Sequence, residues 1–312
     1  MAKNYTADEK ALAVPRELAG LRLDQALVKM FPQYSRNRLQ AWLKSGNILV
    51  DGSRGLGKSI ASGGEKIALA PPPAPDAAQP PAQRMALKIV FEDADLIVVN
   101  KPAGLIVHPG AGNPDRTLMN ALLAHEPRLR LVPRAGIVHR LDKDTSGLMV
   151  VARNLTAQAR LAAQLAGRSV KRVYLALVHG VPPAHGTVEA SIGRDARVRT
   201  RMAVTERGKE ARTNYRVLEQ FSRAALLQCR LDTGRTHQIR VHLQHIGHPL
   251  LGDPVYRRGV RRTVDFPRQA LHAAELELVH PRSGKPMAWS VPLPADMKKL
   301  LAGLRRAGSD AG

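Results

Sequence analysis

Residues 136–154, GIVHRLDKDTSGLMVVARN, hold the densest group of side chains that could do chemistry. Two apolar residues lead to His139, Arg140 and Asp142, and a polar turn then leads into the apolar run 148–152. A carboxylate on a loop between two strands, with a cation beside it, is a candidate nucleophile or general base. An aspartate that only closes a turn through its own backbone gives the same local pattern. The segment alone therefore leaves both roles of Asp142 open.

A second group lies in residues 231–253, where basic and amide side chains alternate with apolar ones. We predict a strand over 238–242, because Gln238, Arg240 and His242 would then share one face. Such a row of donors suits phosphate groups, or it holds a neighbouring carboxylate in its ionised form. A solvated strand face is the alternative explanation. The candidate binding residues of this segment are Arg235, His237 and Gln238.

Tyr174 lies at the start of an apolar run, after the cations Lys171 and Arg172. A tyrosine ring can stack on a nucleic-acid base, and its phenol can take part in proton transfer. Packing in the core explains this residue equally well from the local sequence. The role of Tyr174 therefore depends on what surrounds it.

Several motifs that indicate cofactors are discounted. Residues 52–59, GSRGLGKS, match the P-loop pattern, but the glycines that follow at 63 and 64 exclude the helix that a P-loop must open. We expect a hairpin turn there and no nucleotide cofactor. The histidines within 237–248 lack a neighbouring cysteine and a recognised metal-ligand spacing, so we predict no metal site. The expected set of cofactors is therefore empty.

The charge of the chain indicates its partner. The 312 residues include 48 Lys and Arg against 26 Asp and Glu, a formal net charge of +22. Such an excess favours a polyanionic partner, with RNA first and an anionic membrane surface second. No apolar run approaches the roughly 18 residues that span a bilayer, and the N-terminus does not resemble a signal peptide. We therefore predict a cytoplasmic protein with no membrane partner.

The chain is predicted to form two domains. Residues 1–70 form a small α/β unit whose core is 21–69, and a proline-rich linker follows at 71–84. Residues 85–305 form a larger α+β domain, with a mixed, mainly antiparallel sheet flanked by helices around a central cleft, and 306–312 form a disordered tail. The predicted strands are 87–91, 96–100, 148–152, 174–179, 213–218, 226–231, 238–242 and 276–279, and the predicted helices are 117–125, 155–166 and 297–305.

Taken together, the motifs resemble those of the RluA-type pseudouridine synthases. The likeness covers HRLD at 139–142 with TSG at 145–147, the tyrosine segment 171–177, and LDTGRTHQIRVHL at 231–243. NKPAG at 100–104 with VHP at 107–109 is similar to the family's first strand and loop. The matches are colinear from about residue 85 to 295. Residues 21–69 resemble the S4 RNA-binding module found ahead of some members.

The resemblance implies the isomerisation of uridine, in which the base is detached from the ribose, turned and rejoined through C5. It implies that Asp142 is the essential carboxylate, which either attacks C1′ or takes a proton from C2′. Arg240 would be the cation that keeps Asp142 ionised. Tyr174 would stack on the base and is a candidate for removing the C5 proton. The reaction needs no metal, nicotinamide or nucleotide.

The resemblance also implies that the target base is flipped out of its helix, with Arg140 filling the vacated space. The other substrate-binding candidates are His139, Arg235, His237, Gln238 and Lys101. RNA contacts in the N-terminal unit are expected from Arg22, Arg36, Arg38 and Lys44.

The domain order, with residues 107–115 and 133–152, resembles members that act on a stem-loop of large-subunit (23S) ribosomal RNA. The expected partner is therefore this RNA or a precursor of the 50S particle, bound by a monomer. A synthase for another ribosomal site or for transfer RNA is one alternative. A non-catalytic RNA-binding factor of ribosome assembly is an alternative of a different class.

Overall fold

A computed structural model of the chain describes residues 10–32, 34, 36–70, 80–110, 112–198, 200–257 and 265–309. The chain divides into two compact units, Met1–Gln79 and Pro80–Gly312, called here the N-terminal and the C-terminal unit. The division falls within the proline-rich segment that the sequence predicts as a linker, of which 71–79 lie outside the described residues. No helix in the described ranges is long and apolar enough to cross a membrane.

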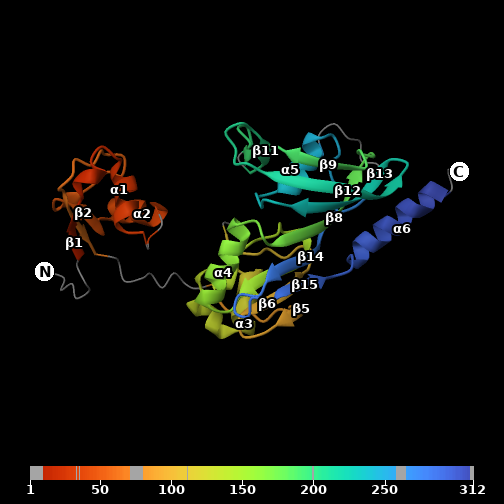
Figure 1. Cartoon of the computed structure of the whole chain (residues 1–312), viewed down its shortest axis with the longest axis horizontal. Coiled ribbons are helices and arrows are strands. Elements are labelled where there is room, and N and C mark those ends of the chain that lie inside the picture. Colours follow the sequence, from red (N-terminus) through yellow and green to blue (C-terminus); the bar gives the residue numbers. More distant parts are fainter. Residues whose placement is uncertain are drawn as a thin grey trace. The chain divides into compact units, whose positions relative to one another are not determined.

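The N-terminal unit packs two helices on a small antiparallel sheet (Figure 1). Gly46, with a φ of 81°, follows α2 and ends it in the left-handed conformation that helix C-termini favour. The apolar side chains of Leu27, Leu39, Ile48 and Ile67 form its core. The sheet order is β1-β4-β2-β3, and the elements are β1 (Lys10–Ala13), η1 (Arg16–Leu18), α1 (Leu23–Met30), α2 (Arg36–Ser45), β2 (Ile48–Val50), β3 (Ser53–Arg54) and β4 (Lys66–Leu69).

The C-terminal unit is built on a nine-stranded sheet in the order β5-β6-β7-β14-β8-β13-β12-β9, with β15 paired to β14. Every pairing is antiparallel except that of β7 with β14. This confirms the predicted mixed, mainly antiparallel sheet of an α+β fold. The strands are β5 (Ile89–Glu92), β6 (Leu96–Lys101), β7 (Ser146–Ala152), β8 (Lys171–His179), β9 (His185–Glu189), β12 (Arg212–Phe221), β13 (Ala224–Leu231), β14 (Leu271–Val279) and β15 (Pro286–Ser290), and β10 (Ile192–Arg194) and β11 (Met202–Val204) form a separate pair.

The parallel junction between β7 and β14 leaves no room for a side chain at position 147. Gly147 lies beside Ala273, and a Cβ atom on it would be 2.1 Å from the Ala273 carbonyl oxygen. Its φ of +116° is also one that L side chains rarely adopt. Only glycine therefore lets the two strands meet directly after the loop that carries Asp142.

The helices follow the predicted pattern with one exception. The segment 238–242, predicted as a strand, belongs instead to helix α5, which begins after His237 in the left-handed conformation (φ 57°). The helical period places Gln238 and His242 one turn apart, and both contact Thr213 of β12. The helices are α3 (Leu118–His125), α4 (Leu155–Ala166), α5 (Gln238–His245) and α6 (Ala295–Ser309), with η2 (Pro127–Leu131) and η3 (Pro133–Gly136) between α3 and β7. Helix α6 thus continues past the predicted end at 305.

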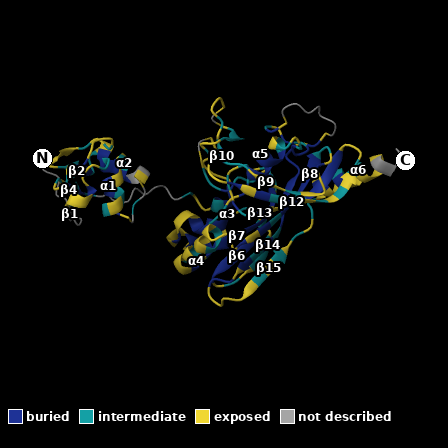
Figure 2. Ribbon diagram, turned by 45° about the horizontal axis from the view of Figure 1, so that its top comes forward, coloured by how far each residue is buried: buried dark blue, intermediate teal, exposed yellow. Residues whose placement is uncertain are grey.

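Buried apolar side chains lie on both faces of the large sheet, because β6 and β7 contribute alternate residues to two clusters. Ile97 and Met149 belong to the cluster that includes α3, and Val98 and Val150 belong to the one that includes α4. Figure 2 shows these strands as the buried centre of the unit and α4 with an exposed outer side. The sheet is therefore packed on both faces, and the loops that connect its inner strands extend from this core.

Candidate active site

A pocket of about 680 Å³ opens beside the inner strands of the large sheet. Its walls are the loop 137–145 between η3 and β7, the first part of β8, and the segment from 231 into α5. It brings together every site residue that the sequence predicts in this unit except Lys101. Residues that are far apart in the sequence thus form the central cleft that was expected.

Arg240 links two carboxylates at the base of this pocket. Its Nη1 donates to Asp142 at 3.0 Å, and its Nε and Nη2 donate to Asp253 at 2.7 and 2.9 Å. Only 5% of the Arg240 side chain and 16% of the Asp142 side chain are exposed. Burial opposes the charge of Arg240, but the hydrogen bonds and charge of Asp253, followed by those of Asp142, raise its pKa. Arg240 is therefore a fixed cation, held by Asp253, that presents one N–H to Asp142.

His237 is the second neighbour of Asp142. Its Nδ1 lies 2.7 Å from the Tyr256 hydroxyl, which accepts the Met202 backbone N–H at 2.9 Å. The hydroxyl can then donate to Nδ1, which leaves the ring hydrogen on Nε2, 3.8 Å from Asp142 Oδ1. Burial lowers the pKa of His237, although Asp142 opposes this shift. A neutral ring thus turns its Nε2–H toward the carboxylate.

Tyr174 is buried in β8 and lines the pocket from the sheet side. Its sheet neighbours are Cys229 of β13 and Ala273 of β14. Burial is the main cause that raises the pKa of its phenol; Asp142 adds to the shift and Arg172 opposes it. The ring is therefore protonated at neutral pH and presents an apolar surface to the pocket.

His139 and Gln238 line the pocket, but the Nε2 atom of His139 and the side-chain amide of Gln238 hold protein groups. The His139 Nε2 accepts the Val150 N–H at 3.1 Å, and burial, followed by the charge of Arg172, lowers its pKa to about 3. The Gln238 side chain accepts from Thr233 and the Arg235 N–H. It also donates to the Arg212 carbonyl and to the Thr213 hydroxyl. The predicted substrate-binding role of Gln238 is corrected by these contacts, because they use both its donors and its acceptor within the protein.

Lys101 does not line the pocket but lies beneath the Asp142 loop. Its Nζ donates to the carbonyl oxygens of Pro102 (2.8 Å), Leu105 (2.9 Å) and Lys143 (2.8 Å). These contacts use all three N–H groups of an ammonium. Burial lowers the pKa of Lys101 to about 7. The predicted substrate contact is therefore corrected to a positioning role, since Lys101 holds the backbone next to Asp142.

The C-terminal part of the chain holds the same loop from the other side. Arg268 Nη1 donates to the Asp144 carbonyl at 2.9 Å, and the Ser146 hydroxyl lies 2.9 Å from His272 Nδ1 in β14. The direction of the Asp142 side chain is thus fixed by segments on both sides of it in the sequence.

Two of the predicted arginines, Arg140 and Arg235, lie at the pocket with part of their side chain in solvent. Arg140 is the more exposed of the two. Arg235 lies at the N-terminal side of α5, and its Nε donates to the Glu210 carbonyl at 3.0 Å. Both remain candidates for contact with a phosphate or a base.

Sequence reasoning missed Asp253 and Tyr256, which complete the site. The signal was present as Asp253-Pro254, a pair that often starts a turn. Asp253 Oδ1 accepts the N–H groups of Val255 (2.8 Å) and Tyr256 (3.0 Å), which forms this turn. The turn brings the Tyr256 ring to 4.9 Å from the Arg240 guanidinium carbon. Local sequence gives the turn but not its distance from Arg240.

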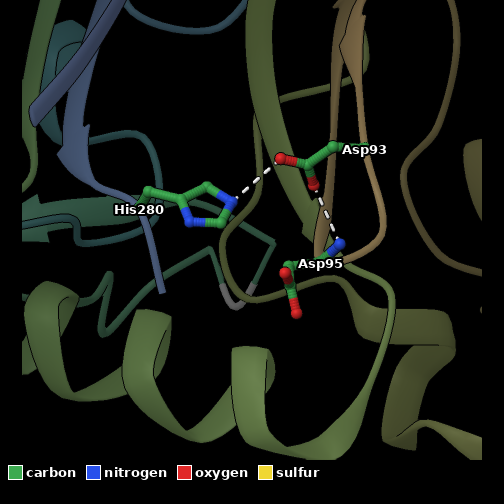
Figure 3. A group of neighbouring side chains, drawn as sticks. All are labelled: Asp93, Asp95 and His280. Atoms are coloured by element: carbon green, nitrogen blue, oxygen red, sulfur yellow. Dashed lines mark hydrogen bonds and ion pairs between the residues drawn. The ribbon is translucent and has the colours of Figure 1, made fainter. Parts of the chain in front are cut away.

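Asp93, Asp95 and His280 form a separate group of possible metal ligands (Figure 3). Asp95 is already paired with Arg282 at 2.7 Å. His280 Nδ1 accepts from the backbone of Arg282 and Ser283, so its Nε2–H donates to Asp93 at 2.9 Å. Their ligand atoms are thus engaged within the protein, where they join the turn before β6 to the turn after β14.

In the N-terminal unit, Arg22 and Arg36 both bind the buried carboxylate of Asp24, at 3.1 and 2.8 Å. Their side chains stay 40% and 45% exposed. Lys44 is exposed near the end of α2. The Arg38 side chain lies outside the described residues.

Known proteins share this arrangement of sequence and fold. The pattern of the RNA pseudouridylate synthase family matches residues 95–245, which include Asp142, Tyr174 and Arg240. Two solved human structures are similar: RNA pseudouridylate synthase domain containing 1 has a TM-score of 0.56 and 28% identity over 72% of this chain and 97% of its own. RNA pseudouridylate synthase domain containing 4 has a TM-score of 0.55 and 27% identity over 70% of this chain and 93% of its own.

Bacterial relatives match nearly the whole length. The ribosomal large subunit pseudouridine synthase D of Nitrosomonas europaea is 55% identical over 300 residues, 94% of this chain and 87% of that protein. The protein of the same name from Pseudomonas aeruginosa is 50% identical over 311 residues, 96% of each chain. Because these likenesses extend through both units and include the residues that meet in the pocket, the chain belongs to the RNA pseudouridylate synthase family.

Proposed function

We propose that this pseudouridine synthase converts specific uridines of one stem-loop in large-subunit ribosomal RNA. The observation that carries the proposal is the contact of Asp142 with Arg240, formed across 98 residues at the base of a pocket that also contains Tyr174. The names of the relatives, ribosomal large subunit pseudouridine synthase D, support the choice of RNA.

The proposed chemistry starts at the ionised Asp142. Its carboxylate either bonds to C1′ of the ribose or removes a proton from C2′, while the N1–C1′ bond breaks. Both routes need a carboxylate that stays charged in a largely enclosed pocket. The Arg240 N–H at 3.0 Å supports this charge, and the nearby His237 Nε2–H adds a weaker contribution. Asp253 holds Arg240 in place, so that no reorganisation is needed when substrate arrives.

Tyr174 is proposed to stack on the target uracil. Its protonated phenol, buried beside the pocket, suits this role better than the removal of the C5 proton, because a raised pKa disfavours the phenolate. Arg140 is proposed to fill the gap that the flipped base leaves in the RNA helix. Such a partner offsets part of the few kcal/mol that unstacking costs.

The N-terminal unit is proposed to act as an S4-like RNA-binding module. Its Arg22, Arg36 and Lys44 expose cations, and a second binding site in the same chain would raise the affinity for a structured RNA. The net charge of +22 supports contact with many phosphates. We expect the protein to act as a monomer on this RNA or on a precursor of the large subunit.

The proposal is tested by mapping pseudouridine with carbodiimide and reverse transcription in unmodified ribosomal and transfer RNA. We expect new stops in one large-subunit stem-loop with the wild type and with Asp144→Asn, a matched change in the same loop. Asp142→Asn should give none. Stops only in transfer RNA would contradict the proposed substrate. Tight RNA binding without any stop, in free RNA and in assembled subunits, would favour the non-catalytic assembly factor instead.

A further inference from the structure

Arg172 is a buried cation in the pocket, and none of the ion pairs within the described ranges includes it. Its side chain is 8% exposed, lines the pocket and has an Nε with no hydrogen-bond partner among the described residues. Two other arginines of the described chain are buried to this extent. Arg240 is paired with Asp253 and Arg268 with Asp296, each at 2.7 Å. Arg172 is thus the exception among the three.

A buried cation without a partner costs free energy, because it loses its interactions with water and gains no equivalent interactions from the protein. The surroundings nevertheless leave space for this guanidinium. A Cβ atom on Gly234 would lie 2.7 Å from Arg172 Nη1, so a side chain at position 234 would push the guanidinium from its place. Gly234 and Arg172 both line the pocket. The position therefore fits a cation that receives its anion from the substrate.

The position of Arg172 in β8 indicates which part of the substrate it meets. Arg172 and Tyr174 are two residues apart in one strand, so their side chains leave the same face of the sheet. This step rests on the proposed function, in which the uracil stacks on Tyr174. The edge of that base would then lie toward Arg172. We infer that the Arg172 guanidinium binds a carbonyl oxygen of the uracil and stabilises its negative charge while the base is detached from the ribose.

The charge balance of the reaction supports this assignment. When the N1–C1′ bond breaks, its electron pair stays on N1 and is shared with the O2 and O4 carbonyl oxygens. Asp142 meanwhile loses its charge, either in an ester with C1′ or by taking the C2′ proton. One negative charge thus passes from Asp142, beside Arg240, to the uracil, beside Arg172. It returns to Asp142 when C5 bonds to C1′, after which the C5 proton is lost and N1 is protonated.

Arg240 is already engaged by two carboxylates, because Asp253 takes two of its five N–H groups and Asp142 a third. A guanidinium without a carboxylate is the group that gains most when charge moves to the uracil. An RNA phosphate offers the same anionic oxygen chemistry to Arg172. The two sources differ in when the charge exists, since a phosphate is charged on binding and the uracil only during the reaction.

The test measures single-turnover isomerisation and RNA affinity for Arg172→Gln, Arg172→Met and Arg172→Lys, with an unmodified large-subunit RNA transcript. We expect the rate to fall at least about 100-fold in the Gln and Met variants and to recover partly in the Lys variant. In an Asp142→Asn background, RNA affinity should stay within about threefold of that of Asp142→Asn alone. Arg216→Met, an exposed arginine of β12, is the matched control and should leave the rate unchanged.

Thermal unfolding separates a catalytic from a structural role. A buried arginine without a carboxylate does not stabilise the free protein, so Arg172→Met should keep or raise the Tm while the rate falls. A lower Tm in both the Met and Lys variants would overturn the inference, and so would an unchanged rate. Affinity that falls in parallel with the rate would assign Arg172 to a phosphate instead. A wild type that isomerises no uridine would contradict the proposed function, whereas equal activity of wild type and variants would contradict only this inference.

Discussion

The two units contain buried ion networks of opposite arrangement. In the N-terminal unit one carboxylate, Asp24, lies between Arg22 and Arg36 and also accepts from Gln40. In the C-terminal unit one guanidinium, Arg240, lies between Asp142 and Asp253, whose carboxylates it contacts with three N–H groups. Both networks fix a charge by surrounding it with charges of opposite sign.

The difference determines which charge meets the substrate. Asp24 is fully buried, and its two arginines stay half-exposed, so the network presents positive charge to solvent. Arg240 is buried, and Asp142 is the more accessible of its carboxylates, so the network presents negative charge to the pocket. The first arrangement suits binding of phosphates, and the second suits an attack on the ribose. The following predictions test this contrast from the largest expected effect to the smallest.

Removing the negative charge in the pocket should have the largest effect. We expect Asp142→Asn to lower the single-turnover rate of isomerisation at least about 10³-fold, while RNA affinity stays within about threefold. The amide oxygen can still accept from Arg240, and Asp253 still pairs with that arginine, so the Tm should change little. Comparable losses of affinity and of rate would show that Asp142 acts in binding.

Removing the central cation should damage the fold of the C-terminal unit. Arg240→Met leaves the buried Asp253 carboxylate without its partner, which we expect to cost about 3–5 kcal/mol of unfolding free energy. Urea unfolding measures this loss. Arg240→Lys, which keeps the charge but not the planar geometry, should cost less. Equal stability of all three proteins would mean that the network is not held by Arg240.

Removing the central carboxylate should cost the N-terminal unit less, because its arginines can return to water. We expect Asp24→Asn to lower the unfolding free energy by about 2 kcal/mol. Burial raises the pKa of Asp24, but the hydrogen bonds of Arg36, Arg22 and Gln40 outweigh it and lower the pKa from 3.8 to about 2. The stabilising effect should therefore be complete above about pH 5 and be lost as the pH falls from there through the folded-state pKa of about 2.

The two tryptophans make this measurement specific. Trp42 lies in α2 and Trp289 in β15, so Trp289→Phe leaves a chain whose fluorescence reports the N-terminal unit alone. In that background the difference between wild type and Asp24→Asn should be much smaller at pH 2 than at pH 7. A difference as large at pH 2 as at pH 7 would contradict the role of the ionised carboxylate.

The smallest effect should come from one exposed cation of the N-terminal unit. Arg36→Gln removes one phosphate contact, so we expect RNA affinity to fall a few-fold and the slope of log affinity against log salt to decrease by about one. The isomerisation rate of bound RNA should stay at the wild-type value. An unchanged salt dependence would show that Arg36 serves Asp24 rather than the RNA.

Much of the site could be predicted from the sequence, and the errors have definite causes. The alternation in QIRVH at 238–242, with β-branched Ile239 and Val241, favours a strand by local pattern. The helix forms because Gln238 and His242 both bind the same strand, β12, which local sequence cannot show. Asp142 and Arg240 were paired through family resemblance. Lys101 was also assigned to the substrate through family resemblance. Its carbonyl partners come from two separate loops, so local sequence cannot show that it holds the backbone.

The parallel junction of β7 with β14 also makes the geometry of the Asp142 loop depend on residues that are synthesised late. A chain synthesised to residue 260 already contains Asp142, Tyr174 and Arg240 but lacks Arg268 and His272, which hold the Asp142 loop. Contacts of such long sequence separation form late in folding. The nascent chain would therefore carry every reactive group on the ribosome without the loop geometry that lets them react, until the strand at 271–279 has emerged.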